Sequence, residues 1–90
     1  MNTQHKELEQ VLKALANRRR LAILQIIRGR RRIHVGGIAQ VLKLSFRAVS
    51  QHLALLAKAG IVEHEQVGLY MHYSLAPDMP SVAQKIIAQL

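Results

Sequence analysis

The segment of residues 36–60, GGIAQVLKLSFRAVSQHLALLAKAG, constrains the fold more than any other part of the chain. It predicts a short helix that carries Ile38 and Leu42, a turn, and a longer helix that begins after Ser45. Ser45 is a good N-cap, because its hydroxyl can accept a hydrogen bond from an unpaired backbone N–H of the first turn. Gly60 is expected to end the second helix, since glycine readily takes the left-handed conformation found at helix C-termini.

The second helix of this segment has two chemically different faces. An apolar stripe is formed by Val49, Leu53 and Leu56, at positions i, i+4 and i+7. The opposite, outer face carries Arg47, Gln51, Ala54 and Lys58. In the DNA major groove arginine pairs with guanine, glutamine pairs with adenine, and a small residue permits close approach. The segment is therefore typical of a helix-turn-helix whose second helix recognises DNA, and an ordinary helical hairpin with a solvated outer face is the alternative.

Charge and composition narrow the class of protein. The 90 residues fit one domain, 1–90, and their 13 Lys and Arg against 5 Asp and Glu give a formal net charge of +8. This excess favours a polyanionic partner, either nucleic acid or an anionic membrane surface. No run is apolar enough to cross a bilayer, and the N-terminus MNTQHKELEQ has no secretory pattern, so we expect no membrane association. The absence of cysteine removes disulfides and thiolate sites and is compatible with a cytoplasmic location.

The flanking segments complete a mainly α (α+β) fold, a winged helix-turn-helix with an extra helix at each end. Residues 4–16 predict a first helix, and Asn17 is the expected N-cap of a second helix that Gly29 ends. The interior of the second helix, LAILQII, is apolar on most sides, so it should be the central buried helix. Residues 30–35 are a candidate short strand, and residues 79–90 predict the last helix.

Residues 61–75 alternate between apolar and polar side chains and predict a β-hairpin. With its tip at residues 67–68, Val62 would lie opposite Tyr73 and Glu63 opposite His72. One face of this hairpin would be apolar and the other polar, as a half-buried hairpin requires. The apolar face comprises Val62, Leu69, Met71, Tyr73 and Leu75, and the polar face comprises Glu63, Glu65, Tyr70 and His72.

The runs LKALANRRRLAIL (residues 12–24) and IAQVLKLSFRAVSQHLALLAKAGIVEHEQVGLYMHYSL (residues 38–75) resemble the ArsR/SmtB family of bacterial winged-helix repressors. The resemblance covers most of the chain. It implies a homodimer joined through the first and last helices, binding to a double-stranded, pseudo-palindromic operator, and release by an inducer that is often a metal. These two helices carry more apolar positions than so small a core can hide, and we expect the surplus at the dimer interface: Leu8, Val11, Leu12, Val82, Ile86, Ile87 and Leu90.

The chain departs from the metal-sensing members of that family. Those members carry a cysteine pair where this chain has His34, Val35 and Gly36, and a second known site uses His and carboxylates where SVAQKIIAQL has neither. A metal site needs three or four converging ligands, whereas the histidines here are scattered along the chain. We therefore expect no metal site and no cofactor, and the sequence does not identify an inducer. The five histidines are His5, His34, His52, His64 and His72.

Candidate DNA contacts lie in two places. Arg47 and Gln51 are expected to contact bases, with Ser50 at the edge of the same face and Phe46 partly buried. Arg18 and Arg19 replace the Pro-Thr that the family often has, and we expect them to bind phosphates; the wing tip has Leu69 where the family often has arginine. Further candidates are Ser45, Lys43 and Lys58, whereas Arg30, Arg31 and Arg32 are expected to be solvated away from DNA.

No arrangement of residues indicates an enzyme. The chain has no Ser/His/Asp spacing, no paired carboxylates and no phosphate-cradling glycine loop. A dimeric, sequence-specific DNA-binding repressor is the function that the sequence favours. Two alternatives remain: a repressor that senses metal through histidines, and a winged-helix module whose basic face binds an acidic protein.

Overall fold

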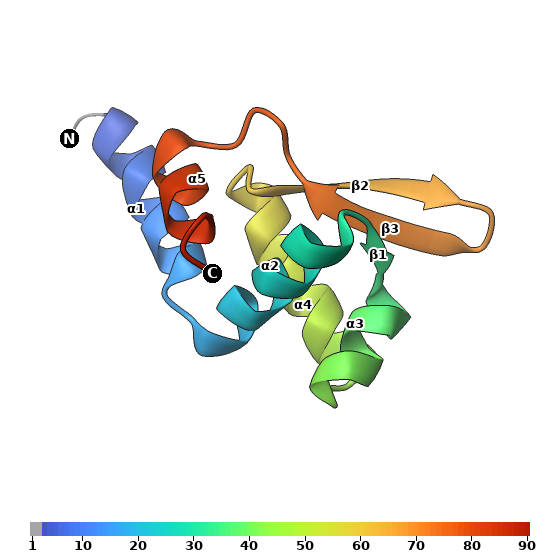
Figure 1. Ribbon diagram of the computed structural model, residues 1–90. Coiled ribbons are helices and arrows are strands. Elements are labelled where there is room, and N and C mark those ends of the chain that lie inside the picture. Colours follow the sequence, from blue (N-terminus) through green and yellow to red (C-terminus); the bar gives the residue numbers. More distant parts are fainter. Residues whose placement is uncertain (1–2) are drawn as a thin grey trace.

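The computed structural model describes residues 3–90, which form five helices and a small three-stranded sheet at one side of them (Figure 1). The order of helix, helix, strand, helix, helix, hairpin and helix confirms the predicted winged helix-turn-helix with an added helix at each end. The elements are α1 Thr3–Leu15, α2 Arg18–Arg30, β1 Ile33–His34, α3 Val35–Leu42, α4 Phe46–Lys58, β2 Val62–Val67, β3 Tyr70–Leu75 and α5 Ser81–Ile87.

The centre of the fold is α2, as its apolar interior predicts. Ile23, Leu24 and Ile27 are fully buried, and α2 packs against α1, α3, α4, α5 and β3. The buried side chains form one cluster that is entirely apolar and largely aliphatic. Besides these three residues, the largest fully buried side chains are Ile38, Val49, Leu53, Leu56 and Ile61.

The beginning of α2 agrees with the prediction, but its end does not. Asn17 is the N-cap, and its side-chain oxygen accepts a 3.1 Å hydrogen bond from the backbone N–H of Arg20. The expectation that Gly29 ends the helix is wrong, because a single helical glycine costs only ~1 kcal/mol and α2 continues to Arg30. The chain turns instead at Arg31, whose φ is +66°, and the predicted strand is reduced to Ile33–His34.

Two arginines of α2 hold the C-terminal ends of the terminal helices. The Arg20 Nε donates to the carbonyl of Ala14 at 2.6 Å, and its Nη2 donates to the carbonyl of Lys13 at 3.1 Å. At the other end of α2, Arg28 Nη1 donates to the carbonyls of Ile87 and Ala88 at 3.1 and 3.2 Å. The last carbonyls of a helix have no partner within it, so these guanidinium groups satisfy them and fix α1 and α5 to the core.

The sheet has the strand order β1-β3-β2, with both pairs antiparallel. Val62 lies opposite Leu75 and Glu65 opposite His72, so the predicted pairs of Val62 with Tyr73 and of Glu63 with His72 are wrong. The tip is at residues 68–69, since Gly68 has a φ of +62° and takes the first central position that a type II′ turn reserves for glycine. Because the error is two residues, the side chains of β2 and β3 stay on their predicted faces, but Leu69, predicted on the apolar face, lies in the turn and is exposed.

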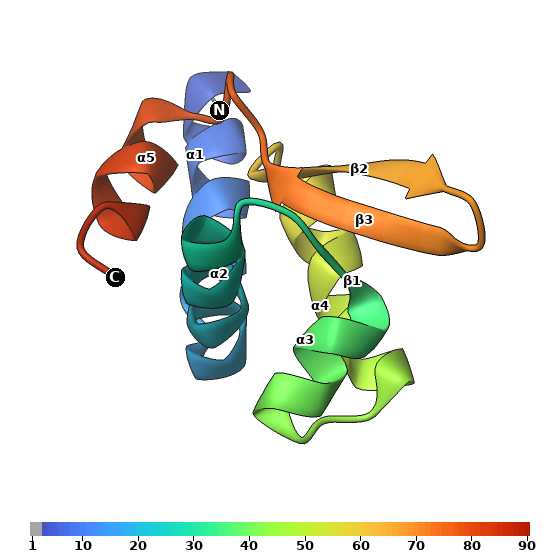
Figure 2. The same cartoon turned by 45° about the vertical axis from the view of Figure 1, so that its right-hand side comes forward.

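The last helix, α5, lies beside α1, and the hairpin projects away from the helices (Figures 1 and 2). It begins at Ser81 rather than near Met79, because a residue that precedes proline disfavours the helical conformation and Pro80 therefore forms the N-cap. None of the helices in the described part of the chain has the length and apolar character needed to cross a bilayer.

Candidate nucleic-acid interface

The turn between α3 and α4 is fixed by local hydrogen bonds. Lys43 adopts a left-handed conformation with φ +56° and ψ +43°, and its backbone N–H and that of Leu44 both donate to the carbonyl of Ala39. Ser45 is the N-cap of α4, as predicted, and its Oγ accepts a 3.0 Å hydrogen bond from the N–H of Ala48. These caps stop α3 and start α4 within three residues, which is the compact turn of a helix-turn-helix.

The apolar stripe of α4 anchors it to the core. Val49, Leu53 and Leu56 are fully buried, whereas Arg47 and Gln51 are exposed. Ala54 and Lys58 are also exposed, so the predicted outer face exists, and Ser50 is partly buried at its edge. The helix therefore presents long hydrogen-bonding side chains on a rigid support.

Phe46 is 63% exposed, so the expectation of a partly buried edge residue is wrong. It is the first residue of α4, and its side chain precedes the turn in which the apolar stripe begins. Val41, near the end of α3, is exposed as well. An exposed aromatic side chain at the N-terminus of such a helix is able to contact a thymine methyl group.

Lys58 occupies a different environment from Arg47. It is in the last turn of α4, about 16 Å along the helix from Arg47 at a rise of ~1.5 Å per residue. There it lines a cavity together with residues of α1. In helix-turn-helix proteins the N-terminal residues of the second helix contact base edges, so this position lies far from the expected contacts.

The start of α2 lies beside α4 and toward the same end of the molecule as the turn between α3 and α4 (Figures 1 and 2). Arg18 and Arg19 are both exposed there. Arg19 is close enough to His52 of α4 to contribute to lowering its pKa. Arg31 and Arg32, which are also exposed, follow the opposite end of α2, as expected.

His52 connects the recognition helix to α2. Its Nδ1 lies 3.3 Å from Arg20 Nη1, and the ring is partly buried beside the core. Burial, followed by the positive charges of Arg20 and Arg19, lowers the pKa of His52 below its ordinary value of 6.5. A neutral imidazole whose Nδ1 accepts a hydrogen bond from the Arg20 guanidinium fits this arrangement. Sequence periodicity places His52 near the core but does not reveal this partner from another helix.

The wing carries little positive charge. Both Glu63 and Glu65 are exposed on β2, and Leu69 at the tip is 93% exposed.

His34, at the base of the wing, accepts a 3.1 Å hydrogen bond at Nδ1 from the N–H of Gly37 and so caps α3. Its ring centroid lies 5.0 Å from that of Tyr70 and 5.8 Å from that of His72. Within residues 3–90, no group of three or more His, Asp or Glu side chains is placed to hold a metal ion.

The predicted dimer residues fall into two groups. Leu8 and Leu12 are 43% and 44% exposed on α1. Val82, Ile86 and Leu90 are partly buried around α5. The remaining two, Val11 and Ile87, are only 5% and 2% exposed within a single chain, so they belong to the core of the protomer rather than to a surface. Their apolar positions on α1 and α5 fit both roles in sequence, and only the packing separates them.

Known proteins resemble this chain in sequence and fold. A family model described as a helix-turn-helix domain matches residues 15–65. The arsenical resistance operon repressor of Escherichia coli K12 is 35% identical over 78 residues, which are 87% of this chain and 67% of that protein. The transcriptional activator HlyU of Vibrio cholerae is 39% identical over 66 residues, 73% of this chain but only 60% of the activator.

Solved structures show the same architecture. The structure of HlyU from Vibrio cholerae superposes with a TM-score of 0.82 at 31% identity and covers 99% of this chain and 92% of its own. The homodimeric winged helix-turn-helix DNA-binding domain Mb0332 from Mycobacterium bovis, described as a possible ArsR-family regulator, has a TM-score of 0.82 at 28% identity and covers 96% of this chain and 76% of its own. These are proteins of DNA binding and transcription, which confirms the expectation of a regulator rather than an enzyme.

Proposed function

Because this chain belongs to the ArsR-type family of winged helix-turn-helix transcriptional regulators, we propose that it is a homodimeric repressor whose α4 recognises a pseudo-palindromic DNA operator. The observation that carries the proposal is the two-sided character of α4. Three fully buried side chains hold the helix in place while Arg47 and Gln51 extend from its opposite face. These are the side chains that form bidentate contacts with guanine and adenine in the major groove.

Contacts to the phosphate backbone are assigned to exposed basic and capping residues near the same end of the molecule. Arg18 and Arg19 at the start of α2 extend the basic surface beyond α4. Lys43 and Ser45 belong to the turn that precedes α4. Such contacts position the protein on the duplex without selecting a sequence. Lys58 is left out of this set because of its position beside α1.

Direct readout is tested by anisotropy titrations with a labelled operator and with unrelated DNA. Arg47→Ala and Gln51→Ala should each cost about 1–3 kcal/mol on the operator, because each removes a bidentate base contact, and less on unrelated DNA. Arg32→Ala is a matched control, since Arg32 is exposed at the far end of α2. Equal losses on both DNA sequences would show that Arg47 and Gln51 contact only the backbone.

The phosphate contacts predict a different signature. Arg18→Ala should weaken operator and unrelated DNA alike, and it should reduce the slope of log K against log salt by about 0.9 if one phosphate contact is lost. An unchanged slope would remove Arg18 from the interface. The same titrations separate a sequence-specific DNA-binding protein from a protein-interaction module, because the basic face of the latter would bind both DNA sequences with the same weak, salt-dependent affinity.

The dimer is proposed to form through α1 and α5, as these helices expose apolar side chains beside one another. Leu8 and Leu12 are exposed on α1, and Ile86 is partly exposed on α5. A two-fold dimer would bind half-sites about 10 bp apart, or a multiple of this spacing. Since the relatives include both a repressor and an activator, a promoter-reporter assay with and without the protein determines the direction of regulation.

We also propose that DNA binding does not respond to a metal ion. The donors that could bind one are separated or engaged: His34 caps α3, and His52 faces the Arg20 guanidinium. Gln84 and Lys85 occupy α5 where imidazole or carboxylate ligands would be needed. Calorimetry with zinc, nickel, cobalt and copper should show no binding tighter than about micromolar. A stoichiometric nanomolar site that also releases DNA would contradict this proposal.

A further inference from the structure

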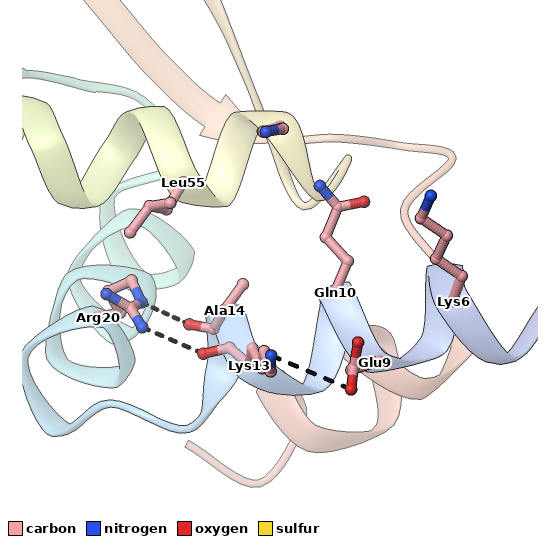
Figure 3. A pocket seen from close by; sticks show the side chains of 8 residues that line it. Lys6, Glu9, Gln10, Lys13, Ala14, Arg20 and Leu55 are labelled. Atoms are coloured by element: carbon pink, nitrogen blue, oxygen red, sulfur yellow. Dashed lines mark hydrogen bonds and ion pairs between the residues drawn. The ribbon is translucent and has the colours of Figure 1, made fainter.

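A cavity of about 440 Å³ lies between α1, the start of α2 and the last turns of α4 (Figure 3). One face of α1 lines it, through Lys6, Gln10 and Ala14 at intervals of four residues. Figure 3 shows Gln10 and Ala14 pointing from α1 toward α4, and Leu55 pointing back from α4. The volume falls within the range of about 300–1,000 Å³ that small-molecule sites occupy.

The polar groups of this cavity are mostly cationic. Lys6, Lys13, Arg20 and Lys58 line it, against a single carboxylate, Glu9. Lys13 is 4.0 Å from Glu9 and both side chains are exposed, so this pair neutralises one positive charge only weakly. Lys6 and Lys58 form no ion pair within residues 3–90. The cavity therefore has a net positive charge and two lysines available for an anion.

The floor of the cavity is apolar. Ala14 is buried at the base of the cavity, and Leu55 of the recognition helix, which also lines the cavity, is 50% exposed. Leu55 lies outside the buried stripe of Val49, Leu53 and Leu56, so it is not needed to anchor α4. A half-exposed leucine beside lysine ammonium groups matches a ligand that combines an apolar body with an anionic group.

We propose that this cavity binds a small amphipathic organic anion, an aromatic or short aliphatic carboxylate or sulfonate. The apolar body would pack on Ala14 and Leu55, and the acid group would pair with Lys6 and Lys58. Gln10, whose amide forms no hydrogen bond within the described chain, supplies a neutral donor and acceptor at the same wall. Inorganic phosphate or sulfate would leave the apolar floor unused.

Such a ligand would contact the recognition helix directly. Leu55 and Lys58 belong to α4, whereas Lys6 and Ala14 belong to α1, the helix proposed to form the dimer. Arg20, in the wall, also contacts His52 of α4 at 3.3 Å. Occupancy would therefore change how α4 is held relative to the dimer axis and alter operator affinity; this coupling rests on the proposed function, but ligand binding does not.

Ligand binding is tested without DNA, by ¹H–¹⁵N NMR titration of the whole chain with sodium 1-naphthoate and with the neutral analogue 1-naphthylmethanol. We expect saturable naphthoate binding with a Kd below about 1 mM, shifts centred on Gln10, Ala14, Leu55 and Lys58, and weaker binding of the alcohol. The double substitution K6Q/K58Q should weaken naphthoate binding about fivefold or more, because both cationic partners are lost. The charge-matched control R32Q/K85Q should not.

A second pair of variants tests the shape of the site. Leu55→Trp places a large side chain in the cavity and should abolish saturable binding, whereas Leu69→Trp makes the same change at the exposed wing tip and should have no effect. Three outcomes would each overturn the proposal. They are equal binding of the acid and the alcohol, chemical-shift changes centred on Leu8 and Leu12 at the outer face of α1, and no saturation at millimolar naphthoate. Operator anisotropy with naphthoate then tests the coupling separately: binding by NMR with unchanged operator affinity would reject only the coupling, and absence of operator binding would reject the proposed function.

Discussion

Arg20→Ala should destabilise the fold by about 2 kcal/mol, because the Arg20 guanidinium donates hydrogen bonds to the last carbonyls of α1. A hydrogen bond from a charged group contributes about 1.5–3 kcal/mol when it is shielded and less when it is exposed. The 2.6 Å hydrogen bond to the Ala14 carbonyl is partly buried, so we assign it the lower end of that range. The 3.1 Å hydrogen bond to the Lys13 carbonyl is exposed and should contribute only a few tenths of a kcal/mol. The contact with His52 adds little, since the imidazole keeps access to water.

Urea denaturation at one fixed protein concentration measures this loss, and the concentration must be fixed because a dimer is stabilised by mass action. The midpoint of thermal unfolding should fall by about 10 °C for a chain of this size. Arg18→Ala is the matched control: Arg18 is exposed in the same helix and forms no hydrogen bond in the described part of the chain, so its loss should cost less than about 0.5 kcal/mol. Equal stability of the two variants would refute the role of Arg20 as a cap.

Three further predictions concern the turn, the recognition helix and the dimer. Lys43→Gly should raise the free energy of unfolding in urea by about 0.5 kcal/mol, because glycine tolerates the left-handed backbone, and weaken DNA binding if the lysine contacts phosphate. Because the pKa of His52 is lower in the folded state, the unfolded state binds a proton at this residue at a higher pH than the folded state does. The free energy of unfolding should therefore fall as the pH drops below 6.5, and it should fall less in His52→Asn. Parallel pH profiles of the two proteins would contradict this prediction. Ile86→Asp should give monomers in sedimentation at micromolar concentration with poor operator affinity, whereas a monomeric wild type would contradict the dimer.

Local sequence chemistry predicted the parts of the fold that depend on neighbouring residues. The N-caps Asn17 and Ser45 are both confirmed, because a side-chain oxygen that accepts from a backbone N–H three residues later needs only local geometry. The buried stripe of α4 and the central position of α2 are confirmed for a similar reason. Helical periodicity fixes which side chains share a face, and the most apolar face must enter the core.

The errors arise where a choice depends on distant packing or on backbone conformation. The hairpin register differs by two residues, since alternation fixes the faces of a strand but only the φ of Gly68 fixes the tip. Val11 and Ile87 lie on the apolar faces of α1 and α5, and periodicity alone could not separate core from interface. Phe46 is apolar yet exposed, which sequence hydrophobicity cannot show for the first residue of a helix.

The arginines of α2 have two roles, since some cap neighbouring helices and others remain exposed, and this explains how so small a chain can be both stable and strongly cationic. Arg20 and Arg28, eight residues apart on α2, donate to the C-terminal carbonyls of α1 and α5, so they act as structural caps. The adjacent Arg18 and Arg19 form no such bonds in residues 3–90 and remain exposed beside α4. Both caps keep their positive charge and count toward the formal charge of +8, but the donors that they use for these carbonyls are not free to contact phosphates. It follows that the number of phosphate contacts depends on which arginines of α2 serve as caps and which remain exposed, a property that no count of residues contains.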